Sequence, residues 1–238
     1  QPQTGKNRRK ISKLILHEGY NYARKFFNAS NAATYDSVVC FATLGRDKMW
    51  KTQIAKIVDE GEFIPTTILE LAAGTGILSS MLDQMSDKTT VHSLDLTLDY
   101  LKKAREKHPT LSLINSTAEL LPFRAETFDS IVSSYLAKYI DIETVVQESW
   151  RVLKQDGVIV FHDFTFPKNP VIEKFWKFHF LLLRLSGKLL KEWAPTFERL
   201  DKLISKTNPW PGDTIRYLRK TGFVKPFCKC HTLGTSAI

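Results

Sequence analysis

The sequence is poor in cysteine and has no apolar run long enough to cross a bilayer. Only three of its 238 residues are cysteine, and a small, odd number is typical of a reducing compartment. No stretch approaches the roughly 20 apolar residues of a membrane-spanning helix, and no signal peptide or internal repeat is visible. We therefore expect a cytoplasmic globular protein. A mass of 27.3 kDa with 43% hydrophobic residues is enough for one domain with a sizeable core.

The sequence has one close group of possible metal ligands and lacks the second group that a structural zinc site needs. Cys228, Cys230 and His231 lie together in the sequence Cys-Lys-Cys-His, which could suggest a metal site. Structural zinc sites, however, need four ligands, commonly from two such pairs. We predict no metal site, with Cys228 and Cys230 as buried or edge thiols on one face of a strand.

The most informative stretch covers residues 66–79. A short apolar run with an acid near its end is followed by a turn of small residues and by the apolar start of a helix. This order is typical of a strand, a glycine loop and a helix. Gly74 and Gly76 allow unusual backbone dihedral angles and let a ligand lie against the main chain. The helix that begins near Gly76 directs unpaired amides at that ligand, which favours an anionic group.

Two features of this loop discriminate between ligands. Dinucleotide sites use three glycines, G-x-G-x-x-G, but the third position here is Ser79. An acid, Glu70, also precedes the loop, and its carboxylate suits a ligand with an ammonium group and a cationic centre better than one with two phosphates. S-adenosylmethionine is such a ligand. The alternative is a glycine turn that binds no cofactor.

Another acid, Asp95, ends the next predicted strand, at residues 89–95, and follows Gly76 by 19 residues. A carboxylate there can accept hydrogen bonds from both hydroxyls of a ribose, in NAD as well as in S-adenosylmethionine. Alternatively, Asp95 or Thr97 could cap the amphipathic helix that continues to Lys107.

Two further strands are predicted to end at the same edge of the sheet, over residues 111–114 and 127–135. A polar cluster at residues 115–119 follows the first of them, and we expect it to contact an adenine edge, because parallel sheets bind ligands at this edge. Residues 158–161 are continuously apolar, which predicts a central strand.

The helices are predicted from apolar spacing. Residues 28–43 should form a short helix and turn over the pocket, with Tyr35 facing it. Helices are also predicted over residues 46–60, 142–153, 194–208 and 213–221, with a turn at 209–212 and two strands within 223–238. The expected buried side of the helix at 46–60 carries Trp50, Ile54, Ile57 and Val58. That of the helix at 142–153 carries Val145, Val146, Trp150 and Leu153.

The order of these motifs resembles that of a known family. The motifs of the cofactor half are Glu70-x-Ala-x-Gly-Thr-Gly, Asp95, Ala118-Glu119-x-Leu-Pro-Phe, Phe128-Asp129-x-Ile and Trp150-Arg151-Val152-Leu153-Lys154-x-x-Gly157. The flanking motifs are Tyr35-Asp36, Leu44-Gly45-Arg46-Asp47-Lys48-Met49-Trp50-Lys51, His162-Asp163-Phe164-Thr165-x-Pro167, Phe178-His179-Phe180 and Thr221-Gly222-Phe223. The chain resembles class I S-adenosylmethionine-dependent methyltransferases. Over about residues 26–238 it is most similar to the ubiquinone and menaquinone biosynthesis C-methyltransferase family.

The resemblance implies an α/β, Rossmann-like fold with a mostly parallel seven-stranded sheet, a C-terminal antiparallel hairpin and a helical lid. It divides the single domain, 1–238, into an N-terminal helical cap (1–60), a cofactor-binding core (61–164), a lid and substrate region (165–222) and the hairpin (223–238). S-adenosylmethionine is the implied cofactor and S-adenosylhomocysteine the product. The predicted cofactor-binding residues are Tyr35, Glu70, Ala72, Gly74, Gly76, Asp95, Leu96, Thr117, Ala118, Glu119 and Ser133.

The implied reaction moves a methyl group from a sulfonium to a nucleophile, so the protein mainly aligns the partners and excludes water. The implied acceptor is a small, apolar aromatic molecule such as a prenylated hydroquinone; another small molecule, a lipid amine or, less favoured, tRNA are the alternatives. The family places an arginine and an asparagine shortly after the fourth strand. This chain is one residue shorter there and has Leu136-Ala137-Lys138-Tyr139. We predict that Lys138 replaces the arginine's charge and that Tyr135, Tyr139 or His179 contacts the acceptor.

Charge and exposed apolar residues suggest further partners. The net charge is +9, and part of it lies in a basic amphipathic segment over residues 6–26. Residues 168–193 are more apolar than one helix face can explain. We expect these two segments to contact a membrane surface peripherally, or the second to line a tunnel or a homodimer interface, with ordinary packing as the alternative. Nucleic acid is less favoured, because Ser133-Ser134-Tyr135-Leu136 stands where methyltransferases of exocyclic amines have Asp/Asn-Pro-Pro-aromatic.

Overall fold

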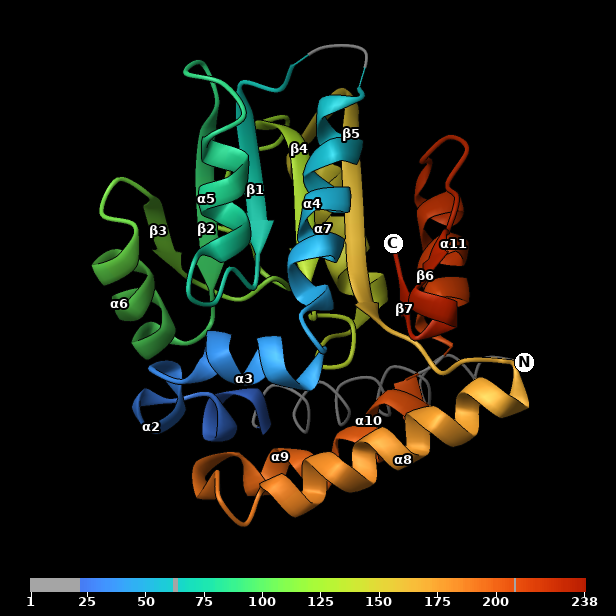
Figure 1. Ribbon diagram of the computed structural model, residues 1–238. Coiled ribbons are helices and arrows are strands. Elements are labelled where there is room, and N and C mark those ends of the chain that lie inside the picture. Colours follow the sequence, from blue (N-terminus) through green and yellow to red (C-terminus); the bar gives the residue numbers. More distant parts are fainter. Residues whose placement is uncertain (1–21, 62–63, 208) are drawn as a thin grey trace, which may run out of the picture.

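The computed structural model describes residues 22–61, 64–207 and 209–238, and seven strands within them form one sheet of order β3-β2-β1-β4-β5-β7-β6 (Figure 1). The first five strands are mutually parallel, and β7 pairs antiparallel with both β5 and β6. The mostly parallel sheet with an antiparallel end is therefore confirmed. The strands are β1 Thr67–Leu71, β2 Thr90–Asp95, β3 Ser112–Asn115, β4 Phe128–Ser134, β5 Leu153–Phe164, β6 Cys230–His231 and β7 Ser236–Ala237.

The order of the strands reverses between β1 and β4, which are neighbours in the sheet. In an open α/β sheet such a reversal leaves a crevice at the carboxyl ends of the strands, where ligands bind. The register pairs Leu71 with Leu94 and with Ser133. The ends of β1, β2 and β4 therefore lie side by side, as the sequence predicts.

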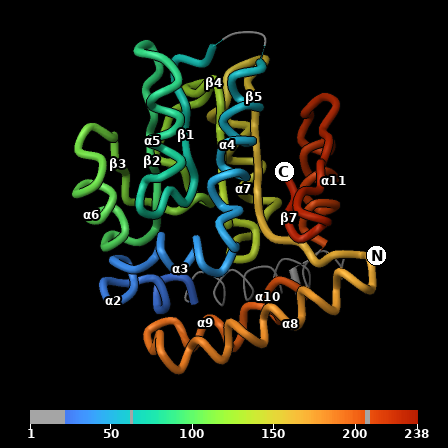
Figure 2. Tube along the Cα trace, in the orientation of Figure 1, coloured from blue at the N-terminus to red at the C-terminus, as the bar shows by residue number. Residues whose placement is uncertain are grey.

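Helices cover both faces of the sheet and the edge where its strands end. In Figure 1, α4 and α5 lie in front of the sheet and α7 behind it, while α2, α3 and α8 to α10 lie below the strand ends. Figure 2 shows that the blue cap helices and the orange lid helices, far apart in sequence, lie side by side there. The helices are α2 Ala29–Ala32, α3 Tyr35–Ala42, α4 Arg46–Asp59, α5 Ile77–Asp83, α6 Leu98–Lys107, α7 Ile142–Val152, α8 Pro170–Ser186, α9 Ala194–Phe197, α10 Leu200–Thr207 and α11 Trp210–Thr221, with 3-10 turns at Lys191–Trp193 and Thr232–Gly234.

The predicted apolar faces are buried except at Ile57, which is half-buried, and at Trp150. On α4, Trp50, Ile54 and Val58 recur every fourth residue and are at most 1% exposed, because this spacing places them on one side of the helix. On α7, by contrast, Trp150 is 46% exposed. Its ring lies at the margin of the α7–α11 contact, 4.8 Å from the ring of Phe223.

The C-terminal half differs from the prediction in three places. The single helix expected over 194–208 is two helices, because the amide of Arg199 bonds back only three residues, to Thr196, and ends α9 in a tight turn. The turn expected at 209–212 is the start of α11. Proline costs nothing in the first turn of a helix, where the amide needs no partner, and Trp210 anchors that turn by donating to the carbonyl of Phe164 at 2.8 Å.

The third difference is the C-terminal hairpin, whose strands β6 and β7 contain only two residues each. Cys228 precedes the strand and Cys230 is in it, and both thiols are exposed. The predicted basic amphipathic segment lies mostly outside the described residues. Within them, none of the helices has the length and apolar content needed to cross a membrane.

Candidate active site

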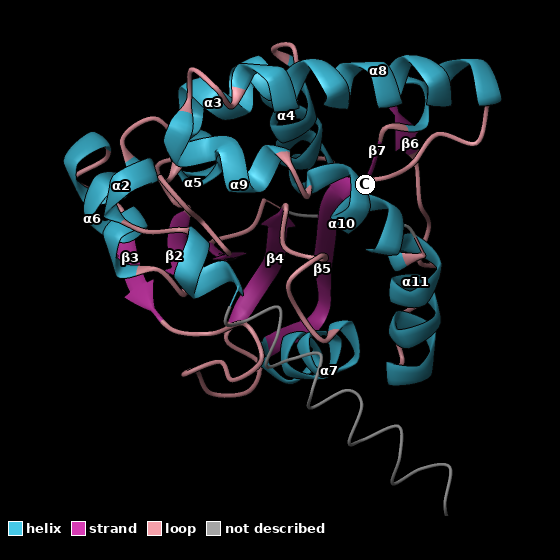
Figure 3. Cartoon of the chain, turned by 90° about the horizontal axis from the view of Figure 1, so that it is seen from below, coloured by secondary structure: helices cyan, strands magenta, loops and turns pink. Residues whose placement is uncertain are grey.

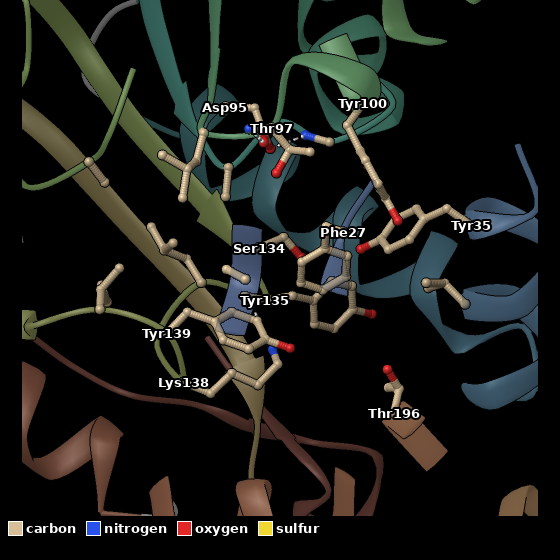
Figure 4. Close-up of a pocket in the computed structure, with 18 of the residues that line it drawn as sticks. Phe27, Tyr35, Asp95, Thr97, Tyr100, Ser134, Tyr135, Lys138, Tyr139 and Thr196 are labelled. Atoms are coloured by element: carbon tan, nitrogen blue, oxygen red, sulfur yellow. Dashed lines mark hydrogen bonds between the residues drawn. The ribbon is translucent and has the colours of Figure 1, made fainter. Parts of the chain in front are cut away.

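A cavity of about 160 Å³ lies where the strands end, and residues of the cap and of the lid contribute to its lining. Figure 4 shows its lining converging from elements that are far apart in sequence. Eleven of the predicted site residues line it, namely Tyr35, Ala72, Gly74, Asp95, Leu96, Thr117, Ala118, Glu119, Tyr135, Lys138 and Tyr139.

The glycine loop forms one wall of this cavity, and Asp95 holds it. Gly74 and Gly76 have φ angles of +58° and +83°, which glycine adopts without strain. The amide of Gly74 donates to Asp95 Oδ2 at 2.8 Å, and the amide of Thr97 donates to Oδ1 at 2.7 Å. Burial raises the pKa of Asp95, and these two hydrogen bonds oppose the rise. Thr97 is the N-cap residue of α6, but its side chain makes no capping bond.

Glu70 lies deeper, beside a smaller cavity that adjoins the first. It is 2% exposed, and burial raises its pKa to about 8, although the hydrogen bond from Ser79 and the nearby charge of Lys51 oppose the rise. Ser79 donates to Glu70 and accepts a hydrogen bond from Ser93 at 2.7 Å. The serine that replaces a third glycine therefore fixes the orientation of the carboxyl group.

The far end of the cavity carries a buried ion pair. Lys138 Nζ lies 2.8 Å from Asp163 Oδ1, and the two side chains are only 5% and 2% exposed. Nζ also donates to the carbonyl of Tyr135 at 2.7 Å and lies 5.0 Å from the centre of the Tyr139 ring. Burial lowers the pKa of Lys138, and Asp163 opposes this. Asp163 Oδ2 is buried and has no hydrogen-bond partner among the described residues.

Aromatic rings form most of the remaining wall. The ring of Tyr35 meets that of Tyr100 edge-on at 5.1 Å, and the ring of Phe27 meets that of Tyr139 edge-on at 5.7 Å. Trp193, from the lid, lies 6.0 Å from Tyr35 and also lines the cavity. An apolar, ring-lined cavity with a few polar groups is typical of a small-molecule site.

Three predicted residues lie away from the cavity lining. Gly76 packs under the loop, where an added Cβ would come within 3.0 Å of Leu111. Ser133 points to the opposite face of β4 from Ser134, which does line the cavity. His179 is on α8, and its Nε2 donates to the carbonyl of Ala42 at 2.8 Å. The predicted contact between His179 and the acceptor therefore has no support in this geometry.

Comparison with known proteins decides the family. The model of the ubiE/COQ5 methyltransferase family matches residues 17–238. Demethylmenaquinone methyltransferase of Streptomyces avermitilis is 34% identical over 87% of this chain and 88% of its own length. The chain belongs to the ubiE/COQ5 methyltransferase family. It is an S-adenosylmethionine-dependent methyltransferase.

One more relative supports this assignment, and one solved structure supports the fold. Ubiquinone/menaquinone biosynthesis C-methyltransferase UbiE of Desulfotalea psychrophila is 30% identical over 94% of this chain and 91% of its own length. Among solved structures, a protein of Bacillus halodurans described as a methyltransferase has a TM-score of 0.53 at 23% identity, and the match covers 79% of this chain and 73% of that one. At that identity the second likeness supports the fold alone.

The residues of the methyltransferase fit the cofactor of its family. S-adenosylmethionine carries a ribose, an ammonium, a carboxylate and a sulfonium. Asp95 keeps acceptor lone pairs beyond its two backbone bonds, and Glu70 supplies a second acid. Gly74 lines both cavities, and residues 116–119 line the larger one together with Asp95.

Several residues of the site could not be predicted from local sequence. The hydroxyl of Tyr135 donates to Asp47 at 2.8 Å, and Asp47 is in turn paired with Lys51 on α4. Asp47 and Lys51 lie in one of the motifs that the chain shares with the family, and this motif was the signal in the sequence that could have identified them as site residues. Tyr100, on α6, reaches the cavity without any signal in its neighbourhood.

Proposed function

We propose that this enzyme transfers a methyl group from S-adenosylmethionine to a ring carbon of a small, apolar aromatic acceptor of the hydroquinone type. The observation that carries the proposal is the buried ammonium of Lys138 in a cavity that several aromatic rings line. Relatives named demethylmenaquinone methyltransferase support this class of acceptor.

The cofactor site in this proposal uses the loop and the two acids. Asp95 accepts hydrogen bonds from the ribose hydroxyls, and Glu70 faces the ammonium of the amino acid end. Residues 116–119 contact the adenine. Bound there, the cofactor supplies an activated methyl group, and the protein's contribution is alignment.

Lys138 acts on the acceptor. A ring carbon of a hydroquinone becomes nucleophilic when the neighbouring hydroxyl ionises, so a positive charge near that oxygen favours the reaction. Because burial lowers the pKa of Lys138, its ammonium is a stronger acid than that of an exposed lysine and donates a stronger hydrogen bond to that oxygen. Asp163 holds Nζ in place at 2.8 Å. The rings of Tyr135 and Tyr139 keep water away from the charge, which strengthens its effect.

The test is turnover with labelled S-adenosylmethionine and a short-chain demethylmenaquinol, with a lipid amine and tRNA as competing acceptors. We expect label on the quinol ring carbon alone, and Lys138→Ala should lower kcat by about 10²–10³ fold. Lys138→Arg, which keeps the charge, should retain more activity than the alanine variant. Transfer to the amine or to tRNA instead, or full turnover by Lys138→Ala, would overturn the proposal.

Cofactor binding is tested separately by calorimetry. Asp95→Ala should weaken binding of S-adenosylmethionine by about 10–100 fold, because a charge-assisted hydrogen bond contributes about 1.5–3 kcal/mol. Ser133→Ala is the matched control and should leave the affinity unchanged, since its side chain does not line the cavity.

A further inference from the structure

The outer face of α8 is apolar and exposed. Its large side chains recur at alternating steps of four and three residues, which places them in one stripe along the helix. The stripe continues past the end of α8, and its members are 47–87% exposed. They are Val171, Phe175, Phe178, Leu182, Leu185 and Leu189, with Leu181 beside them.

The opposite face of the same helix is fully used in packing. Phe180 and Leu183 are 1% and 2% exposed and belong to one cluster with Trp193 and Phe197, which line the active-site cavity. The packing of α8 therefore explains one apolar face and leaves the stripe unexplained. Figure 1 shows α8 at the lower edge of the molecule, below the strand ends, and Figure 3, which is seen from below, shows it along one edge of that view (Figure 3).

Basic residues follow one margin of the stripe. Between residues 168 and 191 the sequence has several basic side chains and a single acid, Glu173, which pairs with Lys177. Arg184 pairs with Asp201. In the described part of the chain no ion pair involves the exposed side chains of Lys174 or Lys188. The basic residues of this segment are Lys168, Lys174, Lys177, Arg184, Lys188 and Lys191.

We propose that α8 docks the enzyme on the surface of an anionic lipid bilayer, with the stripe among the acyl chains and the lysines at the headgroups. A helix that lies in a membrane interface has this combination of an apolar face and a basic margin. Anionic headgroups complement the lysines. A second copy of the chain fits less well, because a symmetric contact between two α8 helices would bring the same basic rows together.

Docking in this orientation sets the lid against the bilayer. Trp193 and Phe197 join α8 to the cavity, so an apolar acceptor dissolved in the membrane would meet the enzyme at its lid. The docking itself does not depend on which acceptor is used, and it is measured without acceptor or cofactor.

The experiment is co-sedimentation of the full chain with vesicles of phosphatidylcholine, with or without phosphatidylglycerol. Phe175→Ser/Phe178→Ser/Leu182→Ser should lower the partition coefficient on mixed vesicles by about a hundredfold, roughly fivefold for each partly immersed side chain. The matched control is Val224→Ser/Phe227→Ser, since these side chains are 82% and 71% exposed in the loop after α11. It should leave binding unchanged.

The lysines give a second test that does not alter apolar packing. Lys174→Gln/Lys188→Gln should weaken binding to the mixed vesicles by about 25-fold, roughly fivefold for each charge, and leave binding to phosphatidylcholine alone unchanged. Size-exclusion chromatography of the same proteins reports the oligomeric state. The proposal is overturned by a wild-type chain that does not bind, or by unchanged vesicle binding in both α8 variants. It is also overturned if the serine variant turns a dimer into a monomer and still binds vesicles as the wild type does.

Discussion

Replacing Lys138 alone should destabilise the enzyme far more than replacing it together with Asp163. Lys138→Met leaves the Asp163 carboxylate buried, with the amide of Phe164 as its remaining donor within the described residues. Removing one partner of a buried pair costs about 3–5 kcal/mol, because the other charge stays desolvated. For a chain of this length we expect Tm to fall by about 10 °C.

The variant Lys138→Met/Asp163→Asn should recover most of this loss. The asparagine is neutral, and its amide oxygen can still accept from Phe164, so we expect Tm within about 3 °C of the wild type. Thermal unfolding followed by circular dichroism compares the three proteins. If the double variant is as unstable as the single one, the two charges do not stabilise each other and our interpretation of the pair is wrong.

The double variant also separates folding from chemistry. It should bind S-adenosylmethionine with about the wild-type affinity and still lose about 10²–10³ fold in kcat, because the positive charge near the acceptor is gone. A stable double variant with full turnover would refute a role for Lys138 in methyl transfer.

Four further substitutions test the site. Burial raises the pKa of Glu70 to about 8, so between about pH 4.5 and 8 the folded chain keeps a proton that the unfolded chain releases, and the free energy of unfolding falls as pH rises. The Tm advantage of Glu70→Gln should therefore widen across that window; a constant difference contradicts this. In urea unfolding, Ser134→Ala should cost about 1–2 kcal/mol because it removes the 2.8 Å hydrogen bond to His162. Ser133→Ala should cost nothing, since the Ser133 hydroxyl has no hydrogen-bond partner among the residues that the structure describes. His179→Ala should leave kcat within about twofold of the wild type, because the ring lies outside the cavity; a larger loss would return it to the site.

Short-range sequence patterns were enough to predict those elements of the fold that depend on a few neighbouring residues. The run 66–79 predicts a strand, a loop and a helix, and β1 and α5 are found there, because apolar periodicity and glycine placement act over a few residues. The turn expected at 209–212 was wrong for the same reason. Proline and glycine in a short stretch suggest a turn, but a buried Trp210 that bonds Phe164 favours the first turn of a helix.

The sequence by itself determined which acids stand at or beside the ends of β1 and β2 and, through its motif order, the family. Only the tertiary structure decided which side chains share the cavity. Lys138 meets Asp163 across 25 residues and Tyr135 meets Asp47 across 88. Such contacts depend on how α4, β4 and β5 pack against one another, and packing is set by the whole core. The same holds for α8, whose two apolar faces are alike in sequence and differ only in what covers them.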